Sequence, residues 1–127
     1  MRKFGKTYSG QVVKNAQALA RALADSNLPV ACSSLRFTKS HQVFLDYGGY
    51  KKGRVVAKKL EATNIIADCG VRLGVCEVTR KGMKEKEMLK IAEFIERVIG
   101  KGENPKKVKF EGAKFASEFQ KVMYCFE

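Results

Sequence analysis

Three long stretches of the chain repeat apolar residues at the spacing of an amphipathic helix. The first runs from Tyr8 to Ser26, where the apolar positions are Val12, Ala16, Leu19, Ala20 and Leu23. The second runs from Lys84 to Ile99 with the same period. The third begins at Pro105, a residue that suits the first turn of a helix, and continues to about Gln120. A shorter helix is predicted from Arg54 to Ala62.

Four short runs between these helices have the composition of β strands: PVACSS (29–34), HQVFLDY (41–47), TNIIAD (63–68) and GVRLGVCEVT (70–79). GGYKKG, at 48–53, has the composition of a turn. The resulting order is helix, strands, helix, strands, helix, helix. This order predicts an α+β fold, with a small antiparallel sheet covered by helices. Residues 1–127 are predicted to form a single domain.

The length of 127 residues and an apolar content of 45% are sufficient for one domain with a genuine core. No apolar run approaches the roughly 20 residues that span a bilayer, and MRKFGKTYSG lacks the apolar segment of a signal peptide. We therefore expect a soluble, cytoplasmic protein.

The four cysteines have no close C-x-x-C spacing and the chain has one histidine, so we expect reduced, mostly buried thiols and no metal site.

The formal charge of +12 is the strongest compositional signal. A basic chain is attracted to nucleic acid, to acidic membrane surfaces or to an acidic partner. The lysines are spread along the chain without an arginine-rich run, and the aromatic residues have core-like spacing. Two interpretations stay open: a charge balanced by an acidic region of a larger protein, and a basic nucleic-acid-binding module. We favour the first and expect no nucleic-acid partner.

One arginine, Arg72, is a candidate binding residue because of its neighbours in the sequence. In DCGVRLGVCEVTRKG (68–82), Arg72 lies between Gly70 and Gly74. Small neighbours leave a guanidinium uncrowded, so that a planar carboxylate can approach it through two hydrogen bonds. On the spacing alone, an exposed arginine that binds nothing is the favoured interpretation.

Four motifs, in this order, resemble the C-terminal small domain of serine hydroxymethyltransferase: YSGQVVKNAQALARAL, TKSHQVFLD, LEATNII and GVRLGVCEVTRKGMKEKEMLKIAEFI. The segment EVTRKGM and the C-terminal segment ASEFQKVMYCFE are most similar to those of archaeal members. The resemblance covers nearly the whole chain.

This resemblance implies a pyridoxal phosphate enzyme of the aspartate aminotransferase fold, in which a large domain holds the cofactor and a small C-terminal domain closes over the substrate. It implies reversible transfer of a one-carbon unit between serine and a tetrahydropterin, with glycine as the other product, and a homodimer as the complete enzyme. The arginine of the family's G-x-R-x-G segment binds the substrate carboxylate, and Arg72 matches it.

The chain also departs from the family pattern. Nothing in it resembles the threonine-rich stretch that ends in the cofactor lysine, so we expect no catalytic and no cofactor-binding residue here and no activity from the chain alone. It would be a cut domain, a remnant, a short gene product, or a separate subunit of a split pyridoxal phosphate enzyme. Only Asp68 and Cys69 separate Ala67 from Gly70, where many members insert a pterin-contacting loop, so we expect no pterin contact.

Two further residues have structural predictions. His41 matches the histidine of the family's T-x-x-H strand, and its imidazole is expected to satisfy nearby backbone groups. Asp46 ends the same strand, where its carboxylate is expected to accept hydrogen bonds from turn amides.

Overall fold

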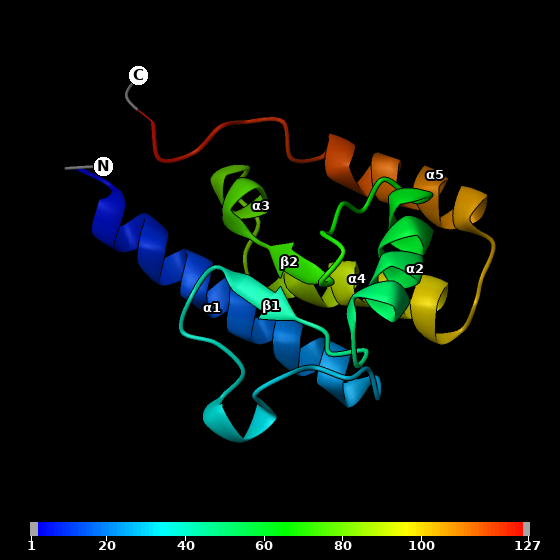
Figure 1. Ribbon diagram of the computed structural model, residues 1–127. Coiled ribbons are helices and arrows are strands. Elements are labelled where there is room, and N and C mark those ends of the chain that lie inside the picture. The colour runs from blue at the N-terminus through cyan, green and yellow to red at the C-terminus, as the bar shows by residue number, and fades with distance from the viewer. Residues whose placement is uncertain (1–2, 126–127) are drawn as a thin grey trace.

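The computed structural model describes residues 3–125 and places a small sheet at the centre, with helices around it (Figure 1). Helix α1, Gly5–Asp25, packs against α4, Glu85–Ile95, and also contacts the sheet. The stripe seen in the sequence is its buried face: Val12, Ala16, Leu19, Ala20 and Leu23 are all in the core. The hydrophobic period therefore predicted both the helix and the face that it buries.

The sheet consists of β1, Gln42–Phe44, and β2, Arg72–Gly74, which pair antiparallel. Val43 lies opposite Leu73, and both side chains are buried. Because side chains alternate along a strand, the residues on either side of this pair face outward. An isolated antiparallel bridge between Val30 and Leu45 brings a third segment against the end of β1. These observations confirm the α+β fold class and the small antiparallel sheet.

The remaining helices are α2, Tyr50–Glu61, α3, Cys76–Arg80, and α5, Pro105–Ser117. Two short non-α segments complete the fold: η1, Ser33–Leu35, is a 3-10 helix, and η2, Glu96–Gly100, continues α4 as a π-helix.

The predicted strand at 63–68 is wrong, because its first two residues form the turn that follows α2. The amides of Thr63 and Asn64 donate to the carbonyls of Leu60 and Glu61, and Asn64 adopts a left-handed φ of 63°. Asparagine is one of the few residues that end a helix in this conformation at low cost. Residues 65–68 then continue without regular structure.

The predicted strand over 70–79 is correct only at Arg72–Gly74, because the chain turns into α3 at Cys76. Thr79 and Val75 are buried, and the Thr79 hydroxyl donates to the Val75 carbonyl at 2.7 Å. Local hydrogen bonding and packing thus override the β propensity of this run. The run at 29–34 likewise contributes only the bridge at Val30 and the turn of η1.

Helix α2 starts at Tyr50, four residues before its predicted start, because Gly53 is part of it rather than of a turn. A Cβ on Gly53 would lie 2.3 Å from the Cys69 carbonyl oxygen, so only glycine lets the helix approach residues 69–71 this closely. The helix therefore packs directly behind the segment that leads to Arg72.

Two findings concern the other expectations. In residues 3–125, no helix is long and apolar enough to cross a membrane. The four cysteines are free, but the prediction of mostly buried thiols is wrong: Cys32 and Cys125 are exposed, and Cys69 and Cys76 are half-buried.

Candidate functional site

Arg72 is the first residue of β2 and lies on the outward face of the sheet, directly opposite Phe44. Its side chain is 56% exposed. The alternation that buries Leu73 against the core is what places Arg72 at the surface. A Cβ at Gly70 would lie 3.2 Å from Asp68 Oδ1 and 3.7 Å from Arg72 Nε, so the tighter contact would be with the aspartate.

Asp68 holds the guanidinium of Arg72. Its Oδ2 accepts a hydrogen bond from Arg72 Nε at 2.6 Å and lies 2.5 Å from Nη2. Its Oδ1 accepts the backbone amides of Gly70, at 2.9 Å, and of Arg72, at 3.0 Å. The Arg72 guanidinium and amide hold the pKa of Asp68 below its usual range, because both donate to the charged form.

Val71 gives this turn its shape. Its φ of 55° is in the left-handed region, which a β-branched residue rarely adopts. The side chain is fully buried, the amide donates to the Asp68 carbonyl at 2.8 Å, and the carbonyl accepts from Leu45 at 3.1 Å. The strained backbone is thus held on both sides by the sheet and the core, next to the residue with candidate binding chemistry.

A shallow depression of about 580 Å³ surrounds Arg72 and is lined by Phe44, Tyr50, Asp68, Cys69, Gly70 and Arg72. Two of these residues, Phe44 and Tyr50, offer exposed aromatic surface. Hydrogen bonding with Cys69 raises the pKa of the Tyr50 phenol. Among the described residues that line the depression, Arg72 is the one cation, which suits a small, flat anion.

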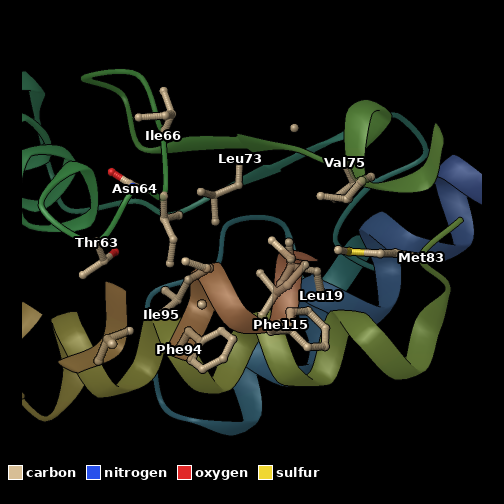
Figure 2. Close-up of a pocket in the computed structure, with 18 residues that line it drawn as sticks. Leu19, Thr63, Asn64, Ile66, Leu73, Val75, Met83, Phe94, Ile95 and Phe115 are labelled. Atoms are coloured by element: carbon tan, nitrogen blue, oxygen red, sulfur yellow. The ribbon is translucent and has the colours of Figure 1, made fainter. Parts of the chain in front are cut away.

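A second hollow, about 370 Å³ in volume, lies on the opposite side of β2 (Figure 2). Leu73 points into it from the strand, and Phe94, Ile95 and Phe115 line it from α4 and α5. Among the residues that the structure describes, no carboxylate, amine, imidazole or thiol lines it. No motif in the sequence indicated this hollow.

The two minor predictions had different outcomes. Asp46 accepts the Gly48 amide at 2.9 Å, as predicted. The prediction for His41 is wrong: its side chain is exposed and has no hydrogen-bond partner in the described part of the chain, and only its backbone carbonyl is used, by Val75.

Asp68 is the site residue that sequence reasoning missed. Two signals were present: an aspartate two residues before a glycine, typical of a turn, and an acid four residues before an arginine. Neither signal distinguishes this pair from an ordinary surface contact without the fold.

Comparison with solved structures defines the class of protein. No protein-family model matches the chain. The structure superposes with a TM-score of 0.86 on the L-threonine transaldolase of Pseudomonas fluorescens in its internal aldimine state, at 35% identity, over 91% of this chain and 29% of that one. The fold is therefore that of one part of a pyridoxal phosphate enzyme of the aspartate aminotransferase fold.

Comparison with curated sequences identifies the relatives within that class. The serine hydroxymethyltransferase of Methanocella arvoryzae is 43% identical over 142 aligned positions that include 100% of this chain. That of Sulfolobus acidocaldarius is 44% identical over 141 positions, and that of Methanothermobacter marburgensis is 39% identical. The chain is thus related throughout its length to the serine hydroxymethyltransferases, of whose length it spans about a third.

Proposed function

We propose that this chain is the C-terminal small domain of a serine hydroxymethyltransferase and that Arg72 receives the carboxylate of the amino-acid substrate. The reaction is transfer of a one-carbon unit from serine to a tetrahydropterin, with glycine as the product. The observation that carries the proposal is the exposed guanidinium of Arg72, fixed by Asp68 at the start of β2 in a depression with aromatic sides.

The role of Arg72 in this reaction is to position the substrate. A planar guanidinium sets both the place and the twist of a carboxylate, which a lysine ammonium does not. Fixing that twist determines which bond at the α-carbon is broken. The strained turn at Val71 and the Asp68 contacts keep the guanidinium oriented before a ligand arrives, so less ordering is required on binding.

Pyridoxal phosphate, when bound in such enzymes, supplies the electron sink for the chemistry. The depression around Arg72 does not fit this cofactor by itself, because no lysine is among the residues that line it. In this proposal the cofactor contacts come from a large domain that is a partner of this chain, and the complete enzyme is a homodimer. The chain alone is then expected to be inactive, and it offers no pterin contact.

The test is replacement of Arg72 in the longer enzyme that contains this chain, or in a complex with a cofactor-binding large domain. A desolvated, bidentate carboxylate pair contributes about 2 to 5 kcal/mol, mostly as the penalty of leaving one charge unpaired. Arg72→Ala should therefore raise the KM for serine by orders of magnitude, and Arg72→Lys should restore little of it. Arg21→Ala removes another exposed arginine, on α1, and should leave the KM unchanged.

Cofactor binding, followed by its absorbance, should be unaffected by all three changes. Near-wild-type affinity for serine in a folded Arg72→Ala enzyme would show that another residue binds the carboxylate.

A further inference from the structure

The guanidinium of Arg72 has two different edges in this structure. A guanidinium carries five N–H groups. Asp68 occupies the side edge, formed by Nε and one hydrogen of Nη2. Within residues 3–125, no acceptor is bound to the terminal edge, formed by Nη1 and the other hydrogen of Nη2. A ligand can therefore reach this arginine end-on without displacing anything.

The carboxylate of Asp68 is held in place by backbone amides, unlike most partners in surface ion pairs. Its second oxygen accepts the amides of Gly70 and Arg72, and its carbonyl accepts the amide of Val71. Rotating the carboxylate away from Arg72 would leave these turn amides without their acceptor. Its negative charge is thus a permanent part of the site.

We propose that Asp68 is a specificity-determining residue of the Arg72 site: a fixed carboxylate that closes the side edge of the guanidinium, admits one monocarboxylate at the terminal edge and weakens the binding of dianions. The inference rests on the proposed function in taking Arg72 as the carboxylate receptor.

The selectivity follows from the charges. Asp68 and Arg72 together are neutral, so a ligand gains directional hydrogen bonds from the guanidinium but little long-range attraction. A carboxylate at the terminal edge lies on the order of 5 Å from the Asp68 charge, close enough for repulsion at a solvent-exposed site. The repulsive free energy is proportional to the charge of the ligand. Asp68 therefore weakens the binding of a dianion by roughly the square of the factor by which it weakens the binding of a monoanion.

Two matched substitutions each remove one carboxylate charge. Asp68→Asn keeps an oxygen that accepts the turn amides, removes the charge beside Arg72 and opens the side edge of the guanidinium, because an amide NH2 group cannot accept hydrogen bonds from Arg72. Asp46→Asn is the control: Asp46 also caps a turn, through the Gly48 amide, and is exposed, but no arginine contacts it. Both substitutions change the net charge of the chain equally.

The experiment uses the full 127-residue chain, labelled with ¹⁵N, at low ionic strength. The Nε–Hε resonance of Arg72, assigned by its loss in Arg72→Lys, is followed during titration with acetate and with malonate at neutral pH. Asp68→Asn should tighten acetate binding about 3-fold and malonate binding about 10-fold. Asp46→Asn should change both by less than about 1.5-fold.

The outcomes separate this inference from the proposal on which it rests. Equal tightening of acetate and malonate, or no change in Asp68→Asn, overturns the role of Asp68 while leaving Arg72 as the receptor. A resonance that responds to neither anion in any variant overturns the receptor role itself. Should Asp68→Asn lose the dispersion of its amide spectrum, Asp68→Ser replaces it, because a serine hydroxyl also accepts turn amides.

Discussion

Asn15 shows how one buried polar side chain holds the segment that follows Arg72. It is fully buried on α1, and its Nδ2 donates to the Thr79 hydroxyl at 2.8 Å and to the Met83 carbonyl at 2.9 Å. Its Oδ1 accepts from Gln11 at 2.9 Å. Every hydrogen-bonding atom of the amide is thus used, which allows it to be buried without a large desolvation cost.

We predict that Asn15→Ala lowers the free energy of unfolding by about 2 to 4 kcal/mol, because it leaves the Met83 carbonyl buried without its donor and creates a small void. Gln11→Ala, which removes only the half-exposed partner, should cost less than about 1 kcal/mol. Urea unfolding followed by circular dichroism measures both. A loss below about 0.5 kcal/mol in Asn15→Ala would contradict this role for the network.

For single residues, the sequence predicted contacts that depend on neighbours along the chain. The turn contact of Asp46 followed from local composition. The role of Asp68 did not, because it requires the left-handed backbone of Val71 to bring the carboxylate back over the guanidinium. Burial in the core holds that conformation, and it cannot be read from the residues of the turn.

Among the elements, α5 is held at the end of α4 by the ion pairs of one arginine, in addition to the packing of Phe115 against Phe94. Arg97, on η2, donates to Glu103 at 2.7 and 2.9 Å and to Glu111, on α5, at 2.6 and 3.0 Å. Its side chain is only 12% exposed. Hydrogen bonding to Arg97 lowers the pKa of Glu103 to about 2 and also lowers that of Glu111.

A carboxylate whose pKa is lower in the folded state stabilises the fold above its unfolded pKa, and this stability is lost as the pH falls through the folded value. We therefore predict that the urea midpoint falls between pH 4.5 and pH 2 more steeply in the wild type than in Arg97→Met. Lys90→Met, which removes the exposed pair with Glu93, should keep the wild-type slope. Parallel profiles for wild type and Arg97→Met would contradict the prediction.

The helices were predictable because each repeats its apolar residues over several turns. The short elements were not. A run such as 70–79 has β composition throughout, yet it divides into β2 and α3. Asn15 on α1 binds the Met83 carbonyl and, within α3, the Thr79 hydroxyl. That contact joins residues 64 positions apart, so no local pattern records it.

For the whole molecule, the charge of +12 is a property of the surface. Helix α2 shows this clearly, because its five basic side chains are all exposed and none forms an ion pair within residues 3–125. They are Lys51, Lys52, Arg54, Lys58 and Lys59. The depression at Arg72, by contrast, includes a single cation.

We predict that the chain is retained on DNA or RNA at low salt and released by physiological salt, without sequence preference. Scattered lysines attract nucleic acid only through their charge, which salt screens. A specific interface would still bind at physiological salt and would give a log–log salt slope of about −0.9 per phosphate contact. Fluorescence anisotropy at several salt concentrations measures the slope. Tight, sequence-selective binding at physiological salt would favour the nucleic-acid-binding alternative.

The beginning of α1 and the segment after α5 lie on the same side of the molecule (Figure 1). The rings of Tyr8 and Tyr124 are 5.3 Å apart, and both segments contact α3, through Tyr8 to the Cys76 carbonyl and Met123 to the Arg80 carbonyl. The path of the chain is therefore almost a closed ring. A short peptide could join the two segments, and the chain could be cut at the exposed turn of 48–49, which gives a circular permutant. We expect this permutant to retain the turn at Arg72, because that turn depends on neighbours in space rather than on the order of the chain.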